Sequence, residues 1–507
     1  MTLSPSFNLL TEDLIGCRTG DGVRQHRSLP AVLALLADPR RVVESFTALQ
    51  AHQAHAWHAF MVQLAAMVCQ RADVSMSDTA CQDETWWRER LRALAGGDAA
   101  WSLLVEDLRQ PAFMQSAVPE GKLDLFGRSF FRPDDFDVLV ATKNHDRKAV
   151  RSSSSIEIWL TVLITSQTMQ GFSGRANYGV FRMNGGFGNR PGIGFARPDD
   201  LAAWFRADVA ALLASRDEVL EHGFTERGHP LLWALPWDGK ASLPLNSLDP
   251  WCIECCRRVR LVSRDGALVL VQAPTVAARV DAPEELTGNV GDPWTPVAKA
   301  DGKALTLPGE GFSYRRAQDL LFSVDWTQPA TQRDPGAATA WVARTLVRGQ
   351  GKTDGFHERH IPISATVRNW LADPDQRSRL AERAKGYVED VKNMRSFVLW
   401  PALKALNGEH GDPPEGPLTT FEADADAHFF LHLLDESHRD DAQAARRSWQ
   451  GRLRIRAEDL LDQAIATASP GSARRWRRIA EARSRFQHGL WTHFISLMEA
   501  SRPEAYA

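Results

Sequence analysis

Apolar residues recur at three- and four-residue spacing early in the chain, which is the period of a helix with one buried face. The periodic positions are Val32, Leu35, Leu36, Phe46, Leu49 and the run 57–68. Before them, residues 7–10 predict a strand, and Gly20-Asp21-Gly22 is typical of a tight hairpin turn. The chain is therefore expected to open with a short β segment followed by helices.

Between residues 101 and 300, apolar residues come in short or alternating runs, which indicate strands within a mixed region. Residues 259–263 and 267–272 are two such runs, and the pair Asp265-Gly266 between them is a turn signal.

Helical periodicity returns after residue 362 and continues to the end of the chain. The apolar stripes lie at Leu380, Ala384, Tyr387, Val391 and Val398, at Phe421, Phe429 and Leu433, and at Ile479, Phe486, Leu490, Phe494 and Leu497. Residues 408–417 predict a connector, and Thr419 with Glu422 matches a capping box that would start the next helix. The sequence thus predicts an α+β protein, with a mixed α/β N-terminal domain over residues 1–362 and a C-terminal helical bundle over residues 363–507.

Composition matters mainly for what it excludes. The 507 residues carry a net charge of -3, so any basic surface has to be local. No apolar stretch reaches the ~18–20 residues of a membrane span, and the N-terminus lacks a signal-peptide pattern, which predicts a cytoplasmic protein. Six cysteines are too few for a disulfide framework in so long a chain, so we expect reduced thiols.

One segment stands out for its backbone. Residues 170–194 contain eight glycines, three arginines and no acid. Glycine lets a backbone approach a ligand closely, and Arg175, Arg182 and Arg190 carry forked donors suited to phosphate. Glycine-rich segments are as often plain loops and bulges, so a structural role is an equal alternative.

Two further basic stretches could likewise bind an anionic ligand. Residues 143–151 are mostly basic and are followed by four serines, and the apolar run 156–169 separates this stretch from the glycine-rich segment, which favours one shared surface. Near the C-terminus, arginines gather on one predicted helix, where a solvated exterior explains them equally well. These arginines are Arg474, Arg475, Arg477, Arg478, Arg483 and Arg485.

The common catalytic motifs are absent. Gly186-Phe-Gly188 lacks the final glycine of a dinucleotide fingerprint, and Gly351-Lys352-Thr353 lacks the first glycine of a nucleotide-binding loop. Gly171-Phe-Ser173-Gly174 is one residue short of a nucleophile elbow, and His357-Glu-Arg-His360 is one residue short of a zinc-protease helix. We therefore predict no enzyme and no catalytic residue.

Two places in the sequence carry side chains that could bind a metal. His52, His55 and His58 could share one helix face, but no carboxylate or cysteine lies in that helix, which favours core histidines. Cys252, Cys255 and Cys256 lack the second pair of a zinc site, which favours buried apolar cysteines. No metal and no cofactor is predicted. A hydrolase with metal-dependent nuclease activity that uses His52 or His55 is one hypothesis for the function of the chain.

Short segments along nearly the whole chain carry a family resemblance. They are Phe7-Asn-Leu-Leu10, Pro111-Ala-Phe-Met-Gln115, Gly171-Phe-Ser-Gly174, Asn184-Gly-Gly186, Gly291-Asp-Pro-Trp294-Thr-Pro, His357-Glu-Arg-His360 and Phe421-Glu-Ala-Asp-Ala-Asp-Ala-His-Phe-Phe430. In order and spacing the chain resembles the large subunit (CasA family) of the type I-E Cascade CRISPR surveillance complex.

The resemblance implies a large mixed α/β N-terminal domain followed by a C-terminal four-helix bundle, without catalytic activity. It implies a subunit of a ribonucleoprotein complex for antiviral defense. Such a subunit reads the protospacer-adjacent motif (PAM) on double-stranded target DNA. It also separates the strands for R-loop formation with the guide CRISPR RNA, contacts other Cascade subunits and helps recruit a helicase-nuclease. The alternative is an architectural subunit that docks partners without reading DNA.

The resemblance also implies three DNA-contacting features, namely a basic loop at 143–155, a glycine loop at 171–178 and a polar wedge at 350–353. The candidate DNA-binding residues are Lys143, Asn144, Arg147, Lys148, Arg151, Gly171, Phe172, Ser173, Gly174, Arg175, Asn177, Gln350, Lys352 and Thr353. Either Gln350 or Lys352 could be the inserting side chain. Arg260 and Lys299 are the candidates for the motif-reading lysine of some members.

Overall fold

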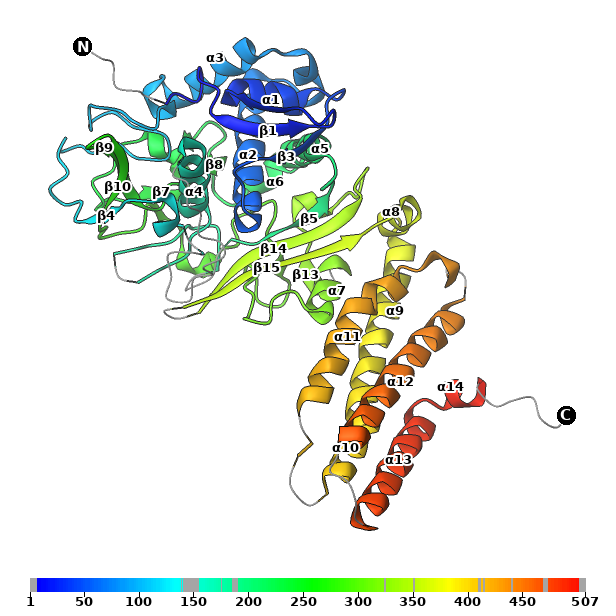
Figure 1. Cartoon of the computed structure of the whole chain (residues 1–507). Helices are drawn as coiled ribbons and strands as arrows, with labels where there is room; N and C mark the ends of the chain where they lie inside the picture. Colours follow the sequence, from blue (N-terminus) through cyan, green and yellow to red (C-terminus); the bar gives the residue numbers. More distant parts are fainter. Residues whose placement is uncertain are drawn as a thin grey trace. The chain divides into compact units, whose positions relative to one another are not determined.

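The computed structural model describes residues 7–137, 139, 155–174, 176–184, 190–322, 325–349, 352–408, 412–413, 415–438, 441–467 and 473–500. The chain divides into two compact units (Figure 1). The first comprises Met1–Phe312 and Asp325–Pro362, and the second comprises Ser313–Val324 and Ile363–Ala507. Residues 313–324 therefore group with the helical unit, although the sequence pattern placed them in the N-terminal domain.

The predicted strand at residues 7–10 was wrong, because only Asn8 pairs there, in an isolated bridge with Ser102. The hairpin expected around Gly20-Asp21-Gly22 is present. β1 (Ile15–Thr19) pairs antiparallel with β2 (Arg24–Arg27), and β3 (Val43–Phe46) lies on the other side of β1. The prediction of a helix at Phe46 was wrong, because this residue pairs with Cys17 across the sheet. That pairing joins residues far apart in sequence, so local periodicity does not show it.

Helices supply most of the core of this unit. They are α1 (Leu29–Ala37), α2 (Ala54–Ala72), α3 (Glu84–Ala95), α4 (Ile156–Thr168), α5 (Leu201–Ala214) and α6 (Arg216–Leu220). The side chains of Ser28, Asp83, Ser155 and Asp200 cap α1, α3, α4 and α5 by accepting backbone N–H bonds.

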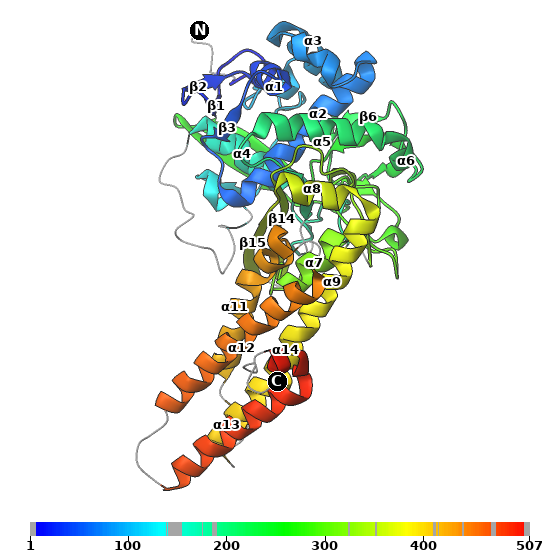
Figure 2. The same cartoon turned by 90° about the vertical axis from the view of Figure 1, so that its right-hand side faces the viewer.

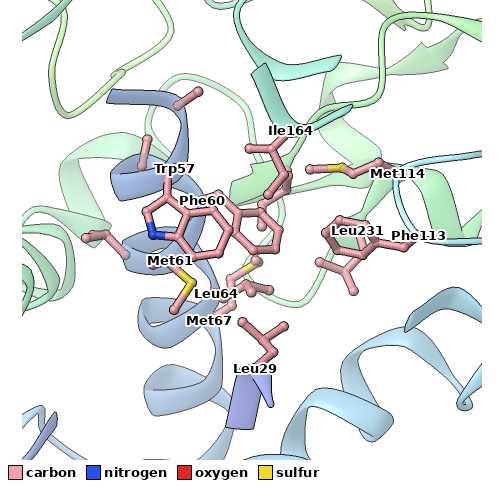
Figure 3. Packing of buried hydrophobic residues seen from close by; sticks show 14 of the residues in the cluster. Leu29, Trp57, Phe60, Met61, Leu64, Met67, Phe113, Met114, Ile164 and Leu231 are labelled. Carbon is pink, nitrogen blue, oxygen red and sulfur yellow. The ribbon is translucent and has the colours of Figure 1, made fainter. Parts of the chain in front are cut away.

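The helix α2 runs through the centre of this core and is buried from Ala59 to Cys69. In Figure 3, Phe60 of α2 lies among apolar side chains that come from several other elements. Phe113 contacts Phe60 at a ring-centroid distance of 5.8 Å, edge to face. The predicted apolar run at 57–68 is thus the buried centre of the unit.

Two three-stranded antiparallel sheets position the candidate site. One has the order β4-β10-β9 and consists of β4 (Arg128–Phe130), β9 (Arg258–Arg264) and β10 (Ala267–Ala273). The other has the order β15-β14-β5 and consists of β5 (Gly192–Ala196), β14 (Ala340–Gly349) and β15 (Lys352–Pro362). The strands predicted at 259–263 and 267–272 are confirmed, and both turn residues between them have positive φ.

Short strand pairs complete the unit. β6 (His229–Leu231) lies parallel to β8 (Leu248–Ile253), and β7 (Leu243–Pro244) lies parallel to β11 (Val280–Asp281). β12 (Val297–Ala298) pairs antiparallel with β13 (Trp326–Thr327).

The second unit is helical. Its elements are α7 (Tyr314–Phe322), α8 (Ala365–Ala372), α9 (Pro374–Asn393), a π-helical stretch (Met394–Leu399), α10 (Trp400–Asn407), α11 (Glu415–Leu433), α12 (Ala442–Thr467), α13 (Ala473–His493) and α14 (Ile495–Ala500). α9 continues through the π-helical stretch into α10, and this continuous rod packs with α11, α12 and α13 as a four-helix bundle (Figure 2). The predicted α+β fold class is therefore confirmed.

The bundle core follows the predicted stripes, whereas two helix boundaries differ. Tyr387, Phe429 and Trp449 pack together, with the Tyr387 and Trp449 rings stacked at 5.3 Å. The predicted capping box was wrong, because α11 already begins at Glu415 and Thr419 lies inside it. Glu422 instead accepts hydrogen bonds from Arg315 of α7. The last apolar stripe is divided between α13 and α14, which are separated at Phe494.

Among the helices of the described ranges, none is both long and apolar enough to cross a membrane.

Candidate nucleic-acid interface

The glycine loop is a closed hairpin-like turn in the first unit. The Ser173 N–H donates to the Asn177 carbonyl, and the Asn177 N–H donates to the Gly174 carbonyl, each at 3.0 Å. At its base, the Val180 N–H donates to the Gln170 carbonyl at 2.9 Å. These hydrogen bonds close the loop at its base, between Gln170 and Val180, and again between Ser173 and Asn177.

Two backbone conformations shape this tip. Gly174 has φ +104° and Ala176 has φ +70°, both in the left-handed region that L side chains adopt at a cost. A Cβ on Gly174 would meet no atom within 4 Å, so the backbone there is open on its outer side. Glycine at this position is required by conformation and leaves the backbone accessible.

Another glycine of the loop serves packing. A Cβ on Gly179 would lie 2.4 Å from the carbonyl carbon of Gly171, so the two arms of the loop touch backbone to backbone. The Phe172 and Tyr178 rings meet edge to face at 6.1 Å beside this contact. The alternative prediction, that the glycines serve the structure of the loop, is thus correct for Gly179, whereas Gly174 faces open space.

Arg257 holds both arms of the loop from inside. Its guanidinium donates to the Gly171 carbonyl at 3.0 Å, to the Tyr178 carbonyl and to the Gln170 side-chain oxygen at 3.0 Å. Arg257 is 3% exposed, and burial lowers the pKa of its guanidinium. Its backbone N–H donates to Gln167 of α4 at 2.7 Å, which fixes Arg257 to the end of that helix.

The end of β10 holds the tip of the loop. The Gln272 amide donates to the Asn177 side-chain oxygen at 3.0 Å, and the Thr275 N–H donates to the Ala176 carbonyl at 3.2 Å. Together with Arg257, these residues anchor the loop at its base and near its tip. Sequence reasoning missed all three, because their partners lie far away along the chain; the only local signal was an arginine directly before a strand.

The structure corrects the role of two arginines in the glycine-rich segment. Arg182 is 2% exposed and donates to the Pro250 and Cys252 carbonyls, and Arg190 is 3% exposed and pairs with Asp292 at 2.5 Å. Both guanidinium groups are used inside the protein, so the prediction that they offer donors to phosphate was wrong. Arg175 lies outside the described residues.

A buried carboxylate accompanies these arginines. Glu254 lies 3.9 Å from Arg182 and accepts a hydrogen bond from the Phe181 N–H at 3.0 Å. Burial raises the pKa of Glu254 to about 7. This acid is therefore partly protonated near neutral pH and belongs to the interior that supports the glycine loop.

The cysteines near this site are buried, as the sequence favoured. Cys252, Cys255 and Cys256 are free thiols, and burial raises their pKa values to about 12, 12 and 11. Thiols with such pKa values stay protonated at neutral pH, which suits packing.

The three histidines considered as metal ligands are held separately. The ring of His52 lies 2.8 Å from Asp137, that of His58 lies 2.8 Å from Asp208, and His55 is enclosed so that burial lowers its pKa well below 6.5. Within the described ranges, no cluster of three His, Cys, Asp or Glu side chains could hold a metal ion.

The predicted basic loop falls on residues 143–155. Lys143, Asn144, Arg147, Lys148 and Arg151 lie outside the described residues. Ser155 is described and caps α4, with its hydroxyl accepting from the Ile158 N–H. On the other side of the loop, Asp137 is fixed by His52 and by Gln53, whose amide donates to it at 2.8 Å.

The predicted wedge corresponds to the end of a long hairpin. β14 and β15 pair from Ala340↔Pro362 to Gly349↔Lys352, and Gln350 and Gly351 between them lie outside the described residues. The third strand, β5, pairs with β14 only as far as Arg344. At ~3.4 Å per residue, the last paired position stands about 17 Å beyond that point. Lys352 and Thr353 therefore belong to the outer end of a two-stranded ribbon (Figure 1).

The base of this ribbon is tied by a charged cluster. Arg344 of β14 pairs with Glu358 of β15, and His360 lies 3.0 Å from the same carboxylate. Arg359, next to His360, donates to the Phe312 carbonyl at 2.9 Å. The Arg359-His360 pair thus secures the ribbon's base.

The two candidates for a motif-reading cation differ in position. Arg260 is 0% exposed, and burial lowers its pKa to about 10, so the proposal that it reads DNA was wrong. Lys299 lies at the surface.

Comparisons with known proteins point to one structural group. No family model matches the sequence, and no curated protein matches it. The structure, however, is similar to Cse1 from Thermobifida fusca, with a TM-score of 0.66 and 17% identity over 98% of this chain and 99% of that one. It is also similar to the CRISPR-associated protein Cse1 from Acidimicrobium ferrooxidans, with a TM-score of 0.62 and 14% identity over 97% and 99% of the two chains. For CasA from Thermus thermophilus the TM-score is 0.59, at 15% identity over 96% and 100%.

The chain therefore has the fold of the Cse1/CasA structures over nearly its whole length. The resemblance stated from the sequence is confirmed at the level of the fold.

Proposed function

We propose that the chain is a non-catalytic, DNA-binding large subunit of a type I-E Cascade complex in the cytoplasm. Support comes from the full-length likeness to Cse1/CasA structures and from the anchored glycine loop. In this proposal residues 1–362 carry the DNA-reading loops and residues 363–507 form the bundle. The partners are double-stranded target DNA, the guide RNA complex, other Cascade subunits and a helicase-nuclease.

One observation carries the proposal. The glycine loop presents open backbone at Gly174 while Arg257, Gln272 and Thr275 hold its shape. Open backbone held in place by these hydrogen bonds fits a minor groove, where the base edges mainly distinguish A·T from G·C pairs. The loop would therefore accept several related protospacer-adjacent motifs.

The β14–β15 ribbon supplies the strand-separating element in this proposal. Its outer end carries Lys352 and Thr353, with Gln350 in the connection. A two-stranded ribbon whose end is polar in sequence suits insertion beside a base pair, after which the guide RNA captures the target strand and the R-loop extends. The basic residues 143–151 would contact phosphates and fix the duplex position.

Two substitutions at Gly174 test the loop. Gly174→Ala adds only the strain of positive φ, a cost of ~1–3 kcal/mol, whereas Gly174→Asp adds a negative charge as well. In a reconstituted guide complex, we expect Ala to weaken motif-dependent duplex binding and Asp to weaken it further, with both proteins folded. Wild-type binding by Gly174→Asp at physiological salt would rule out a glycine-loop role.

A second function has one observation in its favour. Gly179 packs against Gly171, so part of the loop's glycine content is structural. The chain would then be an architectural subunit that docks partners without reading DNA. Substituting Gly174 together with Arg175 separates the two functions, because unchanged DNA affinity in a fully assembled complex would favour architecture.

A further inference from the structure

A groove of about 600 Å³ lies between α10 and α13 in the helical unit, and its lining includes four of the arginines that the sequence places on the last basic helix. α13 packs along α10 there (Figure 1). Five of its ten lining residues are cationic and one is anionic, namely Lys404, Arg474, Arg477, Arg478 and Arg485 against Glu481. The charge imbalance distinguishes this groove from an ordinary solvated helix face.

Three of the five groove cations have no carboxylate partner among the described residues. Within the described part of the chain, no carboxylate pairs with Arg474, Arg477 or Arg478. Glu481 accepts hydrogen bonds from Arg485 at 2.9 and 3.0 Å, so its own charge is compensated. Lys404 lies 4.0 Å from Asp412, at the limit of an ion pair.

The arginines away from the groove on the same helix behave differently. Arg483 donates to Asp462 at 2.9 Å, and Arg475 donates to the Ile465 carbonyl at 3.1 Å. Among the described residues, the unpaired cations of α13 thus gather on the side that faces α10. With Arg485, which is paired with Glu481, the groove-lining cations of α13 cover about 16 Å of helix from Arg474 onward.

An aromatic side chain lies in the same groove. Trp400 begins α10, and the Lys404 ammonium lies 4.6 Å from the centre of its ring. A basic groove with an aromatic side chain is the combination with which proteins bind single-stranded nucleic acid, because phosphates meet the cations and a base can stack on the ring. Guanidinium groups match phosphate with two parallel donors.

We propose that the α10–α13 groove binds the phosphodiester backbone of single-stranded nucleic acid. The site lies in the other unit from the glycine loop and does not depend on motif reading. An acidic polypeptide is the competing ligand. The length of the cation row and the indole in the groove favour a nucleic-acid strand.

The test uses the full-length protein and a labelled 20-nucleotide dT strand, with a 20-base-pair duplex and polyglutamate in parallel. The groove variant is Arg474→Gln with Arg477→Gln and Arg478→Gln. The matched control removes the same charge outside the groove, with Arg379→Gln, Arg447→Gln and Arg483→Gln. A third protein replaces the groove arginines with lysine and keeps the charge.

For single-strand binding, the slope of log K against log salt concentration becomes ~0.7 shallower for each phosphate contact removed. For the groove variant, which lacks three contacts, the slope should therefore be about 2 shallower, and the affinity for the dT strand should be at least about tenfold lower. The control should stay within about twofold of wild type, and the lysine variant should keep most of the slope.

Four results would overturn the proposal. The first is wild-type affinity and slope in the groove variant, and the second is an equal loss in the control. The third is polyglutamate competing as well as the dT strand, which would make the groove a surface for acidic proteins. A loss confined to the duplex would contradict the single-strand assignment.

Discussion

Removing the Arg257 guanidinium should destabilise the conformation of the glycine loop and reduce its discrimination between duplexes with and without the motif. The side chain holds the Gly171 and Tyr178 carbonyls, which lie on opposite arms of the loop. A hydrogen bond from a charged donor is worth ~1.5–3 kcal/mol, so the loss of these two bonds in Arg257→Ala should destabilise the loop by about 4 kcal/mol. Arg257→Lys should have an intermediate effect, since an ammonium cannot bridge two carbonyls as a planar fork does.

The effect on binding depends on the fraction of molecules in which the loop keeps its hydrogen-bonded, closed conformation. Every ~1.4 kcal/mol lost lowers the ratio of closed to open loop tenfold, and apparent affinity falls with the closed fraction. The remaining bonds from Gln272 and Thr275 hold part of the shape. We therefore expect the ratio of affinities for motif-bearing and scrambled duplexes to fall at least about tenfold in Arg257→Ala. Gln272→Ala, which removes one neutral bond of ~1 kcal/mol, should lower it about fivefold.

A matched control is available in the same unit. Arg279 is also buried and donates to the Leu232, Leu235 and Pro236 carbonyls, but it does not contact the loop. Arg279→Ala should destabilise the fold to a similar extent in denaturant titrations and leave discrimination unchanged. If Arg257→Ala keeps wild-type discrimination, or if Arg279→Ala loses it equally, the loop's geometry does not set motif reading.

Three further predictions concern other parts of the chain. Gln350→Ala with Lys352→Ala should slow R-loop formation on paired duplex, where each base-pair step costs ~1.4 kcal/mol to open, and should leave the rate on a pre-melted target nearly normal; if the rates on both targets fall equally, or if neither falls, residues 350–353 do not form a wedge. Because the pKa of Glu254 is about 7 in the folded protein against an ordinary 4.5, the folded state binds the extra proton. The unfolding free energy should therefore fall by up to about 3 kcal/mol as the pH rises from 4.5 to about 7, and Glu254→Gln should lack this fall in urea titrations at pH 5 and 8; parallel curves would contradict the assignment. Of the six cysteines only Cys81 is exposed, so one thiol should react rapidly with a maleimide and none in Cys81→Ser; a second fast thiol would show that a buried cysteine is accessible.

Local periodicity predicted the elements whose burial is continuous along the chain. The run 57–68 became the centre of α2, and the alternating runs at 259–263 and 267–272 became β9 and β10. It failed at Phe46, where pairing with a distant strand decides the structure. It failed also at Thr419, because α11 starts a turn earlier than its best capping pattern.

The candidate site was predictable in outline only. Its glycines mark a loop, but their separate roles depend on space, since Gly174 faces open surroundings while Gly179 meets Gly171. The arginines were harder still. Arg182 and Arg190 lie in a segment whose composition is typical of an anion site, yet their partners are Pro250, Cys252 and Asp292. No local pattern tells an arginine that binds its own chain from one that binds a ligand.

Arginine therefore has two uses in this chain, which the net charge of -3 conceals. Arg257 and Arg279 lie inside the first unit and direct their donors to backbone carbonyls, whereas Arg474 and Arg477 are exposed in the helical unit and have no carboxylate partner among the described residues. The two proposed DNA surfaces should consequently differ in their response to salt. Reading by the glycine loop releases few counterions and depends on shape, while binding in the α10–α13 groove releases one for nearly every contact. Raising the salt concentration should thus remove single-strand binding well before motif discrimination disappears.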